Sequence, residues 1–191
     1  MSQTPTREDA WALLTEYTDN PSLIKHALGV EAAMRAYARS YGEDEEMWAA
    51  IGLIHDFDYQ QNPTEETHLH VGTGILRERG WPEEWVRIVA SHADYMGVPR
   101  DSRAAKVLFA VDELSGFLTA CALVRPDKAI AEVKVKSVKK KLKDKAFARG
   151  VNRDDVRGGA EELGVDLGAH IEFVRDAMAT ISDQLELPPA E

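Results

Sequence analysis

Apolar residues recur along this chain at intervals of three and four, which is the repeat of one face of an α-helix. The spacing predicts a short helix over residues 7–17, a longer one that begins at Pro21, and a third over residues 44–55. No stretch shows the sustained alternation of apolar and polar residues that indicates a β-strand. The pattern therefore predicts an all-α fold.

Residues with strong backbone preferences mark the ends of the next predicted helices. A helix over residues 68–79 is expected to stop at Gly80, because glycine adopts the left-handed conformation that ends helices. Pro82 suits the first turn of the helix that follows. A long helix is predicted over residues 102–124, and Pro126 prevents its continuation.

The remaining third of the chain is predicted to be helical but less regular. Ser137 and Asn152 are the expected N-caps of two helices in this part, because their side chains can accept a hydrogen bond from a first-turn amide. A single apolar stripe over residues 167–185 predicts one final helix.

Length and charge restrict the class of protein. The 191 residues suit one domain over residues 1–191, and the formal net charge of -10 argues against general nucleic-acid binding, which needs clustered positive charge. No apolar run approaches the roughly 20 residues that span a bilayer, and the N-terminal residues lack a secretory pattern. We therefore expect a cytoplasmic protein with no membrane partner, and we predict no particular oligomeric state.

One basic segment departs from the acidic composition. Residues 132–149 contain eight Lys or Arg against two acidic residues, which gives this segment a net charge of +6. A solvated helix face is one interpretation of such a run. The alternative is that Lys134, Lys136 and Lys139 reach a site and bind the phosphate of a substrate, so these three are the candidate substrate-binding residues.

The histidines gather in one part of the chain, because five of the six lie between residues 26 and 92. His55 and Asp56 end an apolar helix, and Asp112 interrupts another. A buried carboxylate is costly unless it is neutralised, and a divalent cation neutralises it well. Histidines and carboxylates on separate helices make a mixed nitrogen and oxygen site that suits Mn, Fe, Co, Ni or Zn.

This ordered set resembles the HD superfamily of metal-dependent phosphohydrolases, which share a histidine, a His-Asp doublet about thirty residues later and a distal aspartate. The resemblance covers about residues 23–123 and implies that His26, His55, Asp56 and Asp112 bind one metal. The implied fold is a helical bundle.

The resemblance also implies a domain organisation. It places the HD core at about residues 20–125 and additional C-terminal helices at about residues 126–191. The whole chain is similar to a small, poorly characterised bacterial branch of predicted HD hydrolases, through the stretch His55-Asp56-Phe57-Asp58-Tyr59 and the lysine-rich residues 135–143.

A second metal is implied by two further histidines. His68 opens a His-x-x-x-Gly pattern with Gly72, and His92 follows an isoleucine-containing half-helix, as in subfamilies that bind two metals. One or two divalent ions are therefore expected. His92 is also a candidate catalytic residue together with Asp58, which could orient a water; the alternative for Asp58 is a solvated loop residue.

The function implied by the resemblance is hydrolysis of a small phosphomonoester or a nucleotide by metal-activated water. Two alternatives remain: an HD-type mixed-valence di-iron oxygenase with the same six ligands, and a non-catalytic nucleotide-sensing HD module. The second is kept open by Tyr59, because several relatives have Glu or Lys there. His170 and Cys121 are predicted to be buried structural residues.

Overall fold

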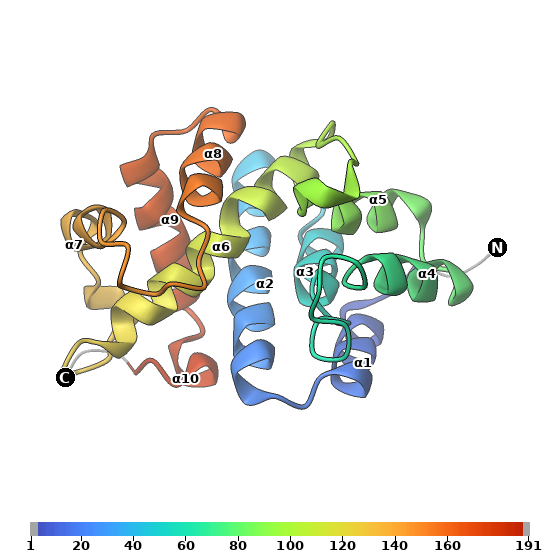
Figure 1. Ribbon diagram of the computed structural model, residues 1–191, viewed down its shortest axis with the longest axis horizontal. Coiled ribbons are helices and arrows are strands. Elements are labelled where there is room, and N and C mark those ends of the chain that lie inside the picture. Colours follow the sequence, from blue (N-terminus) through green and yellow to red (C-terminus); the bar gives the residue numbers. More distant parts are fainter. Residues whose placement is uncertain (1–3, 189–191) are drawn as a thin grey trace.

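Two 21-residue helices form the centre of the protein, whose computed structural model describes residues 4–188. They are α2 (Pro21–Tyr41) and α6 (Arg103–Leu123), and α6 passes diagonally across α2 in Figure 1. On one side of α2, α3 (Glu45–Ile54) packs along it and α1 (Arg7–Tyr17) packs against α3. The described residues contain ten α-helices and no strand, so the predicted all-α fold is confirmed.

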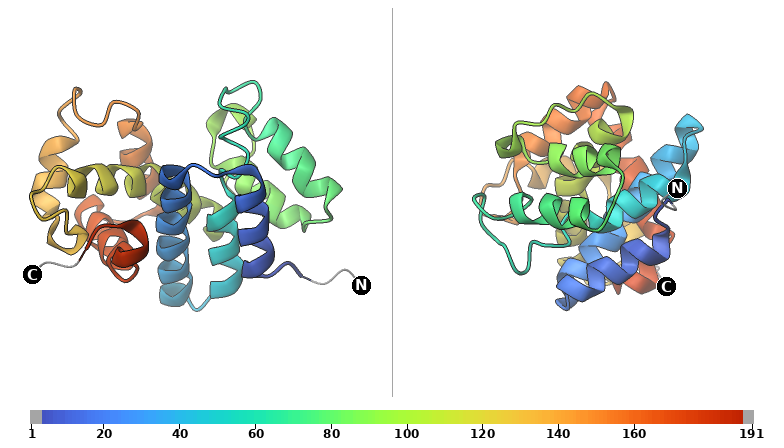
Figure 2. Two further views of the ribbon diagram at one scale, coloured as in Figure 1. Left: turned by 90° about the horizontal axis from the view of Figure 1, so that it is seen from below. Right: turned by 90° about the vertical axis from the view of Figure 1, so that its right-hand side faces the viewer.

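The part of the chain between α3 and α6 packs against both of these helices through α5. It contains α4 (His70–Glu78), α5 (Glu83–Ser91) and a short 3₁₀ helix, η1 (Asp94–Met96). α5 contacts α3, α4 and α6, and both figures of the whole fold show α4 and α5 at one end of the molecule (Figures 1 and 2).

The C-terminal helices pack at the opposite end. They are α7 (Val135–Lys141), α8 (Arg153–Leu163), α9 (Leu167–Ala179) and α10 (Ser182–Leu185), preceded by a 3₁₀ helix, η2 (Ile130–Glu132). α8 packs along α6, α9 contacts both α2 and α6, and α7 lies against α9 at the edge of the molecule (Figure 2).

Side-chain caps explain why the central helices begin where they do. Asn20 caps α2 by accepting from the backbone amide of Ser22, with Pro21 in the first turn as predicted. Ser102 caps α6 by accepting from the amide of Ala105. The predicted cap at Asn152 is also confirmed, since its side chain accepts from two amides of α8.

Two predictions for the C-terminal part are wrong. Ser137 lies inside α7 and does not cap it; Lys134 occupies the N-cap position without a capping side chain. The final apolar stripe is not one helix, because α9 ends at Ala179 and α10 begins three residues later. At the break, the Thr180 hydroxyl donates to the carbonyl of Ala177 at 2.7 Å and competes with the helical hydrogen bonds.

Helices α8 and α9 both contact α6 at Ala110, two residues before Asp112. His170 is buried, as predicted, and its Nε2–H donates to the carbonyl of Ala110 at 2.8 Å, while its Nδ1 lies 2.6 Å from the Tyr37 hydroxyl of α2. Gly159 on α8 lies so close to α6 that an added methyl group would be 2.6 Å from the Cα of Ala110.

Cys121 is buried as well, as expected. None of the described helices combines the length and hydropathy needed to cross a membrane.

We predict that Gly159→Ala lowers the free energy of unfolding by about 1–3 kcal/mol, because the methyl group must push the backbone of α6 away. Gly158→Ala is the matched control on the same helix. Its methyl group meets no atom within 4 Å, and alanine stabilises a helix relative to glycine by up to about 1 kcal/mol. Urea unfolding of both variants measures the difference, and equal stabilities would contradict the close packing of α8 on α6.

Candidate metal centre

Six side chains from five segments point into one half-buried space. His26 comes from the first half of α2, and Asp112 from the middle of α6, which crosses above it. His55 is the C-cap residue of α3, so Asp56 lies just outside the helix. His92 ends α5 in the same way. The sixth residue, His68, lies in the turn before α4, and the prediction that it opens that helix is wrong by two residues.

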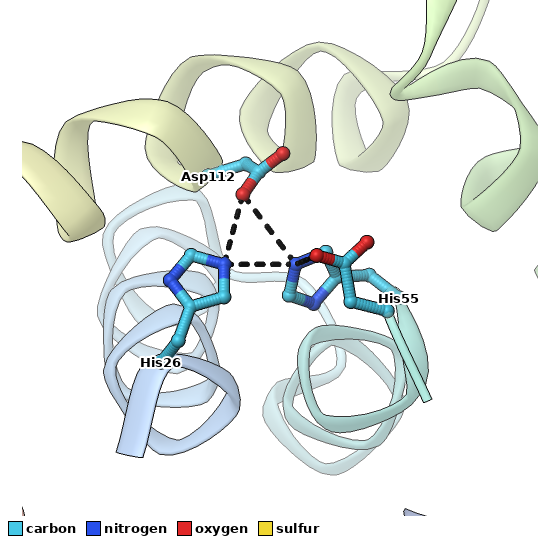
Figure 3. Close-up of side chains that lie close together, drawn as sticks. His26, His55 and Asp112 are labelled. Atoms are coloured by element: carbon cyan, nitrogen blue, oxygen red, sulfur yellow. Dashed lines mark hydrogen bonds and ion pairs between the residues drawn. The ribbon is translucent and has the colours of Figure 1, made fainter. Parts of the chain in front are cut away.

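The first group of donor atoms consists of His26, His55, Asp56 and Asp112, whose ligand atoms lie within 4.8 Å of one another. His26 Nε2 is 3.2 Å from His55 Nε2 and 3.0 Å from Asp112 Oδ1 (Figure 3). His55 Nε2 is 3.4 Å from Oδ1 of Asp112 and 3.4 Å from Oδ2 of Asp56. The four atoms surround one point.

The second group consists of Asp56, His68 and His92. Oδ1 of Asp56 lies 3.1 Å from His68 Nε2 and 3.2 Å from His92 Nε2. Its other oxygen, Oδ2, faces His55 in the first group. Asp56 thus belongs to both groups, and one carboxylate can bridge two neighbouring cations.

The protonation of the imidazole rings suits a metal. His55 Nδ1–H donates to the carbonyl of Gly52 at 2.8 Å, and His92 Nδ1–H donates to the carbonyl of Val89 at 2.6 Å. Because a carbonyl only accepts, each neutral ring presents an unprotonated Nε2 to the centre. Lone pairs and carboxylate oxygens then face one another at little more than 3 Å, an arrangement that needs a positive charge between them. The donor set therefore fits one or two divalent transition ions.

The pKa values of the metal-free site show the same demand for positive charge. Burial lowers the pKa of His55, but the charge of Asp56 and the hydrogen bonds to the two aspartates outweigh it and hold that pKa well above its usual value. Burial raises the pKa of Asp112, yet hydrogen bonds from His26 and His55 hold it well below its usual value. Without a metal, a proton held by His55 offsets the charge of the carboxylates, and a bound cation would replace it.

A pocket of about 460 Å³ opens over both groups. Beyond the proposed ligands, it is lined by acidic, aromatic and small residues from α6, η1, the turn before α4 and the start of α8. They are Tyr59, Glu65, Ala93, Asp94, Tyr95, Phe109, Glu113, Gly116, Asn152 and Asp155. No Lys or Arg is among the lining residues within the described part of the chain.

Glu113 and Asp155 are pocket residues that the sequence reasoning missed. Burial, and then the charge of Asp112, raises the pKa of Glu113 to about 7, so this carboxyl can hold a proton near neutral pH. The sequence carried a signal for Glu113, which follows Asp112 on the same helix. Asp155 carried none, because it reaches the pocket only through the packing of α8 on α6.

Asp58 is not the solvated loop residue that one interpretation expected. Its side chain is fully buried, and it accepts hydrogen bonds from His68 Nδ1 and from the backbone amides of Leu69 and Gly72. With both oxygens occupied beneath His68, it is placed to orient that ring rather than a reacting water. Tyr59, the next residue, lines the pocket with its ring edge-to-face on His68.

The structure does not bring Lys134, Lys136 and Lys139, the candidate phosphate-binding residues, into the pocket. All three are at or in α7, which packs against α9 at the end of the molecule away from α4 and α5 (Figures 1 and 2). Lys139 Nζ lies beside Gly168 at the start of α9, and none of the three lines the pocket. A count of charges cannot tell which neighbour a helix packs against.

Comparison with known proteins gives one match. Residues 23–116 match the family model of the HD domain, and this range contains all six side chains of the two groups. No curated protein and no solved structure is significantly similar to the chain.

We predict that single substitutions separate the two groups. His26→Ala should remove only the first metal and His92→Ala only the second, whereas Asp56→Ala should remove both because its oxygens face both groups. His70→Ala is the control, since its side chain belongs to neither group. Elemental analysis after dialysis against Mn²⁺ gives the stoichiometries. Identical metal content in the His26 and Asp56 variants would contradict a shared carboxylate.

We also predict that replacing Lys134, Lys136 and Lys139 together with Gln leaves the Michaelis constant for any phosphorylated substrate within about twofold of wild type. The reason is that none of the three lines the pocket, and at 0.1 M salt the field of an exposed charge is largely screened beyond about 10 Å. Steady-state kinetics at that ionic strength test this, and a tenfold rise in the Michaelis constant would show that the lysines contribute to substrate binding.

Proposed function

Because this chain belongs to the HD superfamily, we propose that it is a metal-dependent phosphohydrolase whose ions are held by the two groups around Asp56. The observation that carries the proposal is the pair of donor groups with one common carboxylate, at the floor of an open pocket. Two adjacent cation positions of this kind suit reactions in which an attacking and a leaving oxygen must both be stabilised.

The protein's own residues would have three tasks in such a reaction. The two groups would hold one or two divalent ions, whose chemistry would be to polarise a phosphoryl oxygen and to lower the pKa of water. Gly52 and Val89 hold His55 and His92 in the protonation state that binds an ion, through their carbonyls. Asp56 and Asp112 balance the positive charge, and Tyr59 and Tyr95 form part of the pocket wall beside the substrate.

The charge of the pocket favours a small substrate with one phosphoryl group. Six of its lining residues are carboxylates, and Glu113 and Asp155 have no basic partner among the described ion pairs. Arg100, the partner of the pocket residue Asp94, is also paired with Glu162. A single phosphoryl group can be neutralised by the ions, but the further phosphates of a polyphosphate would meet carboxyl groups without basic partners, of which Glu113 is able to hold a proton near neutral pH. We therefore favour a phosphomonoester or a nucleoside monophosphate.

A second candidate function is oxidation by a mixed-valence di-iron centre. It is favoured by the second group, because His68 and His92 supply a complete position for another ion next to the first. The metal decides between the two candidates. Two equivalents of iron in protein purified without chelator, with oxygen consumption, would favour the oxygenase.

We predict that the protein loaded with Mn²⁺ or Co²⁺ hydrolyses generic phosphomonoesters and nucleoside monophosphates faster than the corresponding triphosphates. Asp112→Ala should reduce the rate to that of metal-free protein, because it removes a donor of the first group, while His70→Ala should stay close to wild type. Release of inorganic phosphate measures both. A preference for triphosphates, or hydrolysis that survives Asp112→Ala, would contradict the proposal.

A further inference from the structure

We propose that Asp58 is the positioning residue of the second metal position, because it fixes the ring of His68 with its proton on Nδ1 and its Nε2 free for the ion. The inference rests on the metal groups of the proposed function, but it does not depend on which reaction they catalyse. It assigns a role to a buried carboxylate that lies 3.0 Å behind His68 and touches neither the pocket nor the first group.

The hydrogen bonds of the Asp58 side chain all go to the segment from His68 to Gly72. Oδ1 accepts from His68 Nδ1 at 3.0 Å, and Oδ2 accepts from the amides of Leu69 and Gly72 at 3.1 Å each. The residue at the N-cap position of α4, Leu69, provides no side-chain cap. The carboxylate of Asp58 therefore caps α4 from another segment, and the positive end of that helix stabilises its charge.

The backbone conformation of Leu69 is unfavourable for a residue other than glycine, so other contacts must hold the turn in place. Leu69 has φ 62° and ψ −33°, in the left-handed region, which costs a residue other than glycine about 1–3 kcal/mol. Its side chain is fully buried in the core, and its amide is fixed by Asp58. This reversal of the chain separates His68 from α4 and lets its ring lie between Asp58 and Asp56.

Gly72 is required for the same contact. A methyl group at residue 72 would lie 2.7 Å from Cγ of Asp58 and 2.8 Å and 2.9 Å from its two oxygens. Any larger residue would push the carboxylate away from His68. Gly74, on the same helix, has open space around it, so a methyl group there would meet no atom within 4 Å. The spacing of His68 and Gly72 thus has a physical cause in the place that Asp58 occupies.

His68 differs from His55 and His92 of the site in the partner of its Nδ1. His55 and His92 donate to backbone carbonyls, which are neutral, whereas His68 donates to a buried carboxylate. A carboxylate partner raises the basicity of the opposite ring nitrogen, and loss of such a partner commonly weakens metal binding by about ten- to a hundredfold. Asp58 therefore strengthens the second position and leaves the first unaffected.

Two substitutions test the proposal. In Asp58→Asn, the amide oxygen stays toward the amides of Leu69 and Gly72, and its NH₂ group faces His68 and drives the ring proton to Nε2. Gly72→Ala displaces the carboxylate without changing any polar group, and Gly74→Ala is its matched control. We expect the first two variants to bind the second ion about ten- to a hundredfold more weakly, with unchanged affinity for the first.

Calorimetric titration with Mn²⁺ gives both affinities, and nitrogen NMR of the histidine rings in metal-free protein, at a pH where they are neutral, gives the protonated nitrogen of His68. We expect Nδ1–H in wild type and in Gly74→Ala, and Nε2–H in Asp58→Asn. A merely structural role would leave that tautomer unchanged. An unchanged tautomer, an unchanged second affinity in Gly72→Ala, or the absence of a second ion from wild type would each overturn the proposal. Loss of phosphohydrolase activity alone would not, because neither measurement depends on turnover.

Discussion

The metal centre depends on one constraint, which is that Asp56 and Asp112 are two carboxylates in the same half-buried space and repel each other unless positive charge lies between them. Both carboxylates have an oxygen 3.4 Å from Nε2 of His55, and Asp112 also lies 3.0 Å from His26, so the space is unfavourable unless it also holds positive charge. Each element that contributes a donor must be fixed by something other than this contact. Caps at Asn20 and Ser102 and the packing of α8 and α9 on α6 provide that support.

The donor side chains of the site are short, so the helices that carry them must pack closely together. Histidine and aspartate reach only a few ångströms from their backbones, so donors from α2, α3, α5 and α6 meet only if these segments approach closely. Contact between α6 and α8 at Gly159, and the hydrogen bond from His170 to Ala110, fix α6 two residues before Asp112. Helices far from the chemistry thereby determine where a metal donor lies.

The sequence predicted those parts of the site that local rules determine. The 3.6-residue period and the signals at Pro21 and Pro126 place His26 and Asp112 on long helices, and the six residues that the family resemblance implied as ligands lie in the two groups. The turn at His68 could not be predicted in this way. Its shape depends on a leucine in the left-handed region and on Asp58, ten residues earlier in the chain.

The lysine-rich segment, residues 132–149, also shows that tertiary packing cannot be derived from local sequence, here for the position of charges. Local charge predicted a phosphate site, but α7 packs against α9, so its positive field lies away from the pocket and the pocket itself is acidic. An acidic pocket attracts cations and repels anions until ions occupy it, and bound divalent ions then reverse the local sign. In the proposed reaction, the ions must therefore bind before a phosphorylated substrate. The positive charge for the phosphoryl group would then come from the metal, because no Lys or Arg lines the pocket within the described part of the chain.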